Sequence, residues 1–164
     1  MKPLPSIIGV SEIVLSVADL PSMKSFYIET LGFKLHSELS METPVVDRDG
    51  IPTITFLVIS EIDSPLGRNG HPQMLVLIDH LRHVYAKARF IGHDVGRSTL
   101  NHIAFEIPPD EYDAHTRHLT AQGIELSHTV FPDLNAKAMF LKDPEGNVLE
   151  LICYHATGVH DAHN

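Results

Sequence analysis

The sequence predicts an α+β fold made of two copies of one unit, a strand, a helix and three further strands (βαβββ). Two observations predict it. The run SEIVLSV at residues 11–17 returns 90 positions later as NHIAFEI at residues 101–107, and both runs alternate in the way that half-buried strands do. The elements that follow each run also come in the same order at nearly the same spacing, which is typical of an internal repeat.

A helix is expected after each of these strands. In the first copy Asp19 is placed to cap a helix that has Pro21 in its first turn, and apolar residues recur at helical spacing as far as Leu31. In the second copy acidic residues open the helix. Gly32 and Gly123 follow the two helices and are candidates for left-handed helix ends.

Three strands are expected after each helix. The matching segments are residues 33–35 with 124–126, 52–60 with 136–143, and 74–79 with 148–153. The last two strands of the second copy are joined by the turn sequence DPEGN, whereas the first copy has a longer loop there. The predicted boundaries are a first module at 1–79, a linker at 80–98, a second module at 99–153 and a flexible tail at 154–164.

Composition limits the function classes. The chain has 12 Lys and Arg against 21 Asp and Glu, a formal net charge of −9, whereas binding to nucleic-acid phosphates needs a basic surface. The single cysteine, Cys153, excludes a disulfide framework and favours a reducing compartment. No apolar run approaches the roughly 20 residues of a membrane-spanning helix. We therefore expect a cytoplasmic protein without a nucleic-acid or membrane partner.

Polar residues on the predicted strands are the candidates for chemistry. Alternate side chains of a strand share a face, so Glu12 and His102 occupy matching positions on the small or polar face of the two first strands. Glu106 lies on the same face as His102. Glu150 interrupts the apolar run VLELIC. Because buried carboxylates are rare unless they are paired or coordinated, Glu150 requires a partner.

These segments resemble the vicinal oxygen chelate superfamily, which includes glyoxalase I, the extradiol dioxygenases and bleomycin resistance proteins. The resemblance covers residues 9–153 and rests on EIVLSVADL and SFYIETLGF in the first half, and on LNHIAFEI and FLKDPEGNVLEL in the second. It implies that the two βαβββ modules form a cupped mixed sheet (the glyoxalase/bleomycin resistance/dioxygenase fold) with a divalent metal in the cup.

Carried onto this sequence, the family's ligand positions fall on Glu12, Val76, His102 and Glu150. Valine cannot bind a metal, so the resemblance implies the metal ligands Glu12, His102 and Glu150, with positions left open for water and substrate. Carboxylate-rich ligand sets suit Mn, Ni or Mg, with Zn or Fe as further candidates. Glu12, Glu106 or Glu150 would act as the catalytic base.

The function implied is that of a metal-dependent, glyoxalase-like lyase or isomerase acting on a small oxygenated substrate through a metal-stabilised enolate or alkoxide. Four of the 12 Lys and Arg residues lie at 80–98, where they would attract an anionic substrate. One alternative is an extradiol-type ring-cleavage dioxygenase using Fe(II), although Glu12 and Phe140 stand where those enzymes tend to carry histidine and tyrosine. The other is a non-catalytic, bleomycin-type binding and resistance protein. A homodimer is expected, with modules paired within one chain or swapped between two.

Overall fold

The chain folds into two compact units, residues 1–93 and 94–164, each with its own four-stranded sheet. The computed structural model describes residues 10–40, 51–60, 72–84, 86 and 100–154. The predicted linker and tail fall largely on residues 87–99 and 155–164, which lie outside the described residues, so those boundaries stay predictions. Among the described residues, no helix has the length and apolar character needed to cross a membrane.

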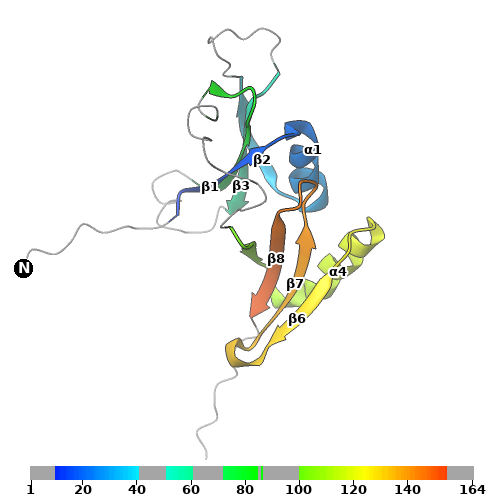
Figure 1. Ribbon diagram of the computed structural model, residues 1–164. Helices are drawn as coiled ribbons and strands as arrows, with labels where there is room; N and C mark the ends of the chain where they lie inside the picture. The colour runs from blue at the N-terminus through cyan, green and yellow to red at the C-terminus, as the bar shows by residue number, and fades with distance from the viewer. Residues whose placement is uncertain (1–9, 41–50, 61–71, 85, 87–99, 155–164) are drawn as a thin grey trace, which may run out of the picture. The chain divides into compact units, whose positions relative to one another are not determined.

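The first unit follows the predicted order of strand, helix and three strands (Figure 1). Its elements are β1 (Glu12–Val17), α1 (Leu20–Ser25), the π-helical turn η1 (Phe26–Thr30), β2 (Lys34–Leu39), β3 (Ile54–Ser60) and β4 (Gln73–Asp79). The sheet order is β1-β4-β3-β2. Strand β1 runs parallel to β4, and the other neighbours are antiparallel.

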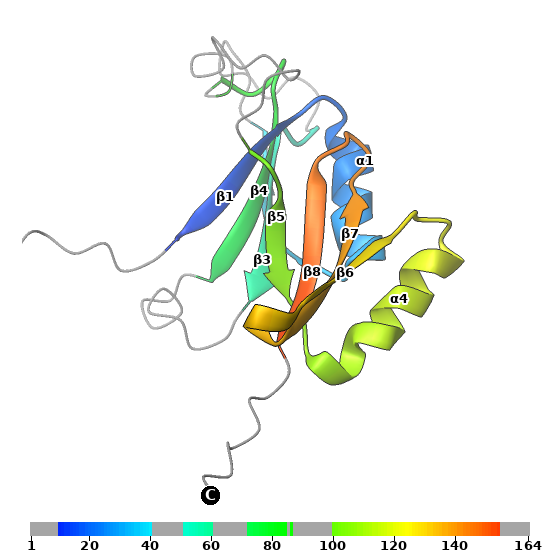
Figure 2. The same cartoon turned by 60° about the horizontal axis from the view of Figure 1, so that its bottom comes forward.

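The second unit repeats this topology (Figure 2). Its elements are β5 (Ile103–Glu106), the short 3₁₀ helix η3 (Pro109–Glu111), α4 (Tyr112–Ala121), β6 (Ser127–Phe131), the 3₁₀ turn η4 (Pro132–Leu134), β7 (Ala136–Lys142) and β8 (Val148–Tyr154). The order β5-β8-β7-β6, with β5 parallel to β8, corresponds strand for strand to the first sheet. The predicted α+β fold of two βαβββ modules is confirmed.

The helix ends form where the sequence predicts them. Asp19 caps α1, and its side chain accepts a hydrogen bond from the backbone N–H of Ser22 at 3.0 Å. Gly32 and Gly123 adopt φ values of 77° and 75° after the helices, a left-handed conformation that glycine reaches without steric cost. The N–H of Ile124 then bonds to a carbonyl of the last helical turn. For this reason β6 begins just after the predicted segment 124–126 rather than within it.

The register of the strands shows which positions of the two modules correspond. Val76 on β4 is opposite Phe56 on β3, and Glu150 on β8 is opposite Phe140 on β7. Both pairs lie at the same place in their sheets, in agreement with the sequence alignment of the two halves. The second module therefore carries a carboxylate at the position where the first carries valine.

A tight hairpin maintains this register in the second sheet. The DPEGN turn connects β7 to β8, and Oδ1 of the buried Asp143 accepts hydrogen bonds from the backbone N–H groups of Glu145 and Asn147 at 3.0 and 2.9 Å. A one-residue slip of a strand would turn each side chain to the opposite face. Asp143 thus helps to keep Glu150 on the face that carries the polar strand residues.

Each sheet buries one face under its helices. On β5, Ile103 and Phe105 are buried while Ala104 and Glu106 are exposed, and β1 shows the same alternation, with Leu15 buried and Glu12 exposed. In Figure 2, α4 runs along the second sheet. The opposite face of this sheet, here named the open face, presents side chains from three strands and the residue that precedes β5: His102, Ala104, Glu106, Phe140, Glu150 and Ile152.

Candidate metal centre

Glu150 and His102 meet on the open face of the second sheet. Nε2 of His102 lies 3.1 Å from Oε2 of Glu150. The Glu150 side chain is only 7% exposed, whereas the His102 side chain is 36% exposed. Among the described residues, no other hydrogen bond or ion pair reaches this carboxylate. The partner that a buried carboxylate at Glu150 requires is therefore His102.

The pair lies beside an apolar patch. The His102 ring packs edge-on against Phe140, with ring centroids 5.8 Å apart and an interplanar angle of 84°. Buried residues continue the patch along β7 and β8, namely Ala136, Ala138 and Ile152. Low-polarity surroundings strengthen electrostatic interactions, so a cation next to the Glu150 carboxylate would be held more strongly than on an open surface.

Both nitrogens of the His102 ring face hydrogen-bond acceptors. Nδ1 lies 2.7 Å from Oδ1 of Asn101, and an amide oxygen can only accept, so Nδ1 carries a hydrogen. Nε2 faces the carboxylate of Glu150, which also accepts when ionised. With Nδ1 as the donor to Asn101, Nε2 and the Glu150 carboxylate face each other as two groups that can bind a metal cation.

The spacing of the pair fits a metal ion. With metal–ligand distances of about 2.1 Å, an imidazole nitrogen and a carboxylate oxygen are about 3.4 Å apart at the tetrahedral angle of Zn²⁺ and about 3.0 Å apart at the right angle of an octahedral ion. The observed separation in the His102–Glu150 pair is 3.1 Å. This donor set suits Zn, Mn, Fe or Ni. The residues present thus fit a divalent cation as two of its ligands.

Glu12, the third predicted ligand, lies in the first unit. It is exposed on β1, on the polar face that the sequence analysis assigned to it. In that unit Val76, which corresponds to Glu150, is only 1% exposed and packs with Ile54 and Met74. Within the described residues, no group of three or more His, Cys, Asp or Glu side chains is close enough to hold a metal ion. The structure brings two of the three predicted ligands together, and Glu12 stays a prediction.

Glu106, the further candidate for a base, is exposed at the end of β5 and is opposite Ile152 on β8. It shares the open face with His102 and lies two residues beyond Ala104, which is itself opposite Glu150. Two residues along a strand span about 6.6 Å. Along the strand, Glu106 is thus about 6.6 Å from the position opposite Glu150 and about 13 Å from His102.

A buried contact between a histidine and a threonine lies in the first unit, at residues that the sequence did not single out. Nδ1 of His83 lies 2.9 Å from Oγ1 of Thr53, and both residues are almost fully buried. Burial lowers the pKa of His83, and the nearby Asp79 carboxylate partly opposes this shift. The only sequence hint is Asp79 at the strand end, which accepts hydrogen bonds from the next backbone N–H groups. This pair stabilises the end of β4.

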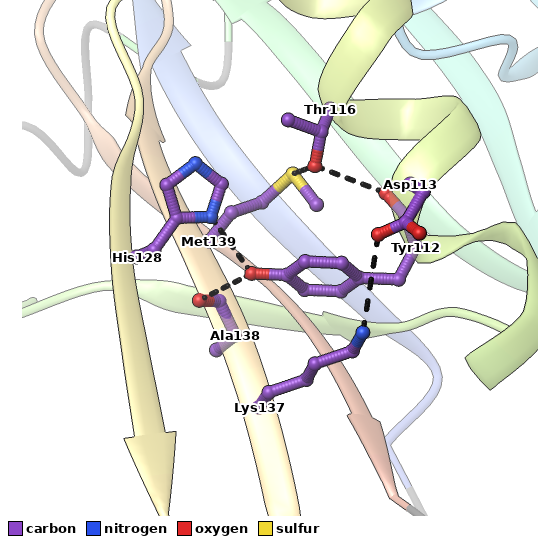
Figure 3. A network of polar contacts seen from close by, with 7 residues as sticks. All are labelled: Tyr112, Asp113, Thr116, His128, Lys137, Ala138 and Met139. Atoms are coloured by element: carbon purple, nitrogen blue, oxygen red, sulfur yellow. Dashed lines mark hydrogen bonds and ion pairs between the residues drawn. The ribbon is translucent and has the colours of Figure 1, made fainter.

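A polar network joins α4 to β6 and β7 of the second sheet (Figure 3). By strand register, His128 and Met139 are on the face opposite the His102–Glu150 pair. Tyr112 donates a hydrogen bond to the carbonyl of Ala138 at 3.0 Å, and its Oη lies 2.8 Å from Nδ1 of His128. Burial raises the pKa of Tyr112, and the nearby Cys153 and Asp113 act in the same direction. The network is structural and not part of the candidate centre.

A comparison with protein-family models identifies the family. Residues 9–151 match the model of the Glyoxalase/Bleomycin resistance protein/Dioxygenase superfamily. The chain therefore belongs to this superfamily. No curated protein matches the sequence.

Solved structures with the same fold share about a fifth of their residues with this chain. The fosfomycin resistance protein FosX from Listeria monocytogenes is 20% identical, with a TM-score of 0.60 over 92% of this chain and 97% of that one. The lactoylglutathione lyase from Agrobacterium tumefaciens is 21% identical, with a TM-score of 0.59 over 93% and 96%. A FosX mutant with Mn(II) and 1S,2S-dihydroxypropylphosphonic acid is 20% identical, with a TM-score of 0.61 over 92% and 94%.

Proposed function

We propose that this protein is a divalent-metal-dependent enzyme of the glyoxalase type, a lyase or isomerase that acts on a small oxygenated molecule. The observation that carries the proposal is the buried carboxylate of Glu150 with Nε2 of His102 at 3.1 Å. A structural ion pair is weak support for stability, because desolvation offsets its attraction. Binding of a metal cation explains the closeness of this carboxylate and imidazole better than a stabilising ion pair does.

In this proposal His102 and Glu150 hold the cation, and Glu12 supplies the third ligand. Glu12 occupies in the first module the position that His102 occupies in the second, 90 residues later. Three protein ligands leave coordination positions for substrate. A bound divalent cation would supply Lewis-acid polarisation of a substrate carbonyl.

The remaining chemistry is proton transfer by the chain's own carboxylates. Glu106 is exposed on the open face and is free to accept a proton from the carbon next to a carbonyl group. Glu12 and Glu150 are the other candidates for this base, provided that one of them is released from the metal. The apolar patch around Phe140 would exclude water from one side of the reacting carbon.

The FosX mutant was solved with Mn(II) and a dihydroxypropylphosphonic acid, a small molecule with adjacent hydroxyl groups and an anionic phosphonate. This supports the proposal of a small substrate with adjacent oxygen atoms, which carries an anionic group. A cytoplasmic protein is proposed because Cys153, the only cysteine, is a buried free thiol. A homodimer is also proposed, on the basis of the resemblance to the vicinal oxygen chelate superfamily.

Metal analysis and an exchange assay test the function together. We expect protein purified without chelator or nickel resin to contain stoichiometric Mn, Ni, Zn or Mg. With that metal, we expect it to exchange the proton next to the carbonyl of small hydroxy-ketones for deuterium in D₂O. Glu106→Gln should slow this exchange by 10²-fold or more, as loss of a general base does, if Glu106 is the base.

The same experiment separates the alternatives. Stoichiometric iron with oxygen-dependent cleavage of catechols would indicate an extradiol-type dioxygenase. Absence of bound metal, together with tight binding of a small molecule, would indicate a non-catalytic resistance protein. Either result would contradict the lyase or isomerase proposal.

A substitution in the first module tests the role of Glu12. Glu12→His would create two imidazoles and one carboxylate, the set suited to Fe(II). We expect apo Glu12→His to shift its preference from Mn(II) toward Fe(II) in anaerobic competition. If the preference is unchanged, and Glu12→Ala binds metal as wild type does, then Glu12 is not a ligand.

A further inference from the structure

Asn101 precedes β5, and its side chain contacts the His102 ring on the side away from Glu150. Oδ1 of Asn101 lies 2.7 Å from Nδ1 of His102. Because an amide oxygen accepts and cannot donate, this contact places the ring hydrogen on Nδ1. Nε2 is then the nitrogen that faces Glu150, at 3.1 Å.

We propose that Asn101 is a positioning residue for the metal centre, an inference that rests on the proposed function. Its hydrogen bond selects the tautomer in which the Nε2 lone pair is available to a cation, and it fixes the plane of the ring. Metal-binding histidines generally donate their other ring N–H to such an acceptor, and loss of the acceptor costs 10- to 100-fold in affinity or activity, about 1.4 to 2.7 kcal/mol.

The surroundings of the ring explain why an acceptor is useful here. His102 is partly exposed, with 36% of its side chain accessible, so packing alone does not hold the ring. Phe140 contacts it edge-on. A hydrogen bond at Nδ1 adds the second constraint that is needed to keep Nε2 directed at the carboxylate.

The first module provides an internal contrast. The residue before Glu12 is Ser11, at the position that Asn101 occupies before His102. A carboxylate has two equivalent oxygens and no tautomers, so it needs no partner to select the ligating atom. An amide side chain precedes His102 but not Glu12. This difference is expected if the role of the amide is to orient an imidazole ring.

Titration with Mn(II) tests the proposal in the folded 164-residue chain. Asn101→Leu has similar volume without an acceptor and should bind Mn(II) about tenfold more weakly than wild type. Asn101→Asp retains an acceptor oxygen and should bind at least as tightly as wild type. As a matched control, Gln122→Leu removes an amide that lies 3.0 Å from the ring of His118 on α4, and it should leave the affinity unchanged.

A spectroscopic measurement distinguishes positioning from a general structural effect. In ¹⁵N-labelled protein loaded with Zn(II), the Nδ1–H signal of His102 should exchange slowly with solvent in wild type and Asn101→Asp. It should be lost in Asn101→Leu, whereas the backbone amide signals stay in place.

The outcomes separate the two proposals. If Asn101→Leu binds Mn(II) as wild type does while His102→Ala binds it at least tenfold more weakly, the centre stands and the role of Asn101 is wrong. If His102→Ala also binds as wild type does, the metal centre itself is wrong, and the proposal for Asn101 fails with it.

Discussion

The two modules have the same strand order and corresponding registers, but they differ where chemistry is expected. In the first sheet, Val76 packs with apolar neighbours, and no ligand lies at this position. In the second, Glu150 at the corresponding position meets His102. Phenylalanine is opposite both of these residues, Phe56 in the first sheet and Phe140 in the second. The scaffold has been kept in both modules, and the polar pair occurs in one.

The modules also differ on their helix-covered faces. In the first, Glu38 on β2 accepts hydrogen bonds from Lys24 on the helix and from Thr55 on β3. In the second, His128 on β6 contacts Tyr112 on α4. Both contacts join a helix to the outer strand, but one uses a half-exposed ion pair and the other a buried hydroxyl. The two modules can use different polar contacts on this face because these contacts only stabilise the fold.

Exchanging the residues at the Val76 and Glu150 positions should have the largest effect on stability. In chelator, Val76→Glu should lower the free energy of unfolding by about 3 kcal/mol or more, because it places an unpaired carboxylate in an apolar cluster. Glu150→Val should change it by no more than about 1 kcal/mol, because His102 is partly exposed and remains hydrated. Urea denaturation measures both. Equal changes in the free energy of unfolding for Val76→Glu and Glu150→Val would contradict the claim that only the second module accommodates a carboxylate at this position.

A smaller effect is expected at the helix contacts. Tyr112→Phe should cost about 1 to 2 kcal/mol, because it removes the donor to Ala138 and the partner of His128 in a buried place. Lys24→Met should cost about 0.5 kcal/mol, as half-exposed ion pairs typically do. The same urea titrations provide the comparison. A larger cost for Lys24→Met than for Tyr112→Phe would reverse this ranking.

The smallest effect concerns pH. The folded pKa of His83 is lowered from 6.5, so as the pH falls below 6.5 the unfolded chain takes up a proton before the folded one does. Stability contributed by neutral His83 is present above this pH and is lost below it. His83→Gln should therefore show a smaller decrease in melting temperature between about pH 7.5 and pH 5.5 than wild type. His36→Gln, which changes an exposed imidazole, should follow wild type.

Much of the fold could be predicted from the sequence because its signals are local. Asp19 before Pro21, and the glycines after each helix, specify the helix ends. Strand alternation places Glu12 and His102 on polar faces, and the apolar run around Glu150 indicates that this carboxylate is buried. The start of β6 was harder to predict, because its sequence SHTVF alternates only weakly between polar and apolar residues. In addition, the N–H of Ile124 bonds to the carbonyl of Leu119 at the end of α4, so the strand begins after this residue.

The candidate site could be predicted only in part. That Glu150 needs a partner follows from burial alone, but the identity of the partner depends on the pairing of β5 with β8. The Thr53–His83 contact joins residues 30 positions apart, and no periodic pattern connects them. The interaction of Asn101 with His102 depends on side-chain direction at the start of a strand, which sequence spacing does not determine.

The central claim is that Glu150 is a metal ligand rather than a structural carboxylate. The most direct test is the dissociation constant for Mn(II) of wild type and Glu150→Gln, which has the same shape without the charge. Calorimetric titration of chelator-treated, dialysed protein provides both values. We expect Glu150→Gln to bind at least tenfold more weakly, a loss of about 1.4 kcal/mol or more. Equal dissociation constants for the two proteins would contradict the claim.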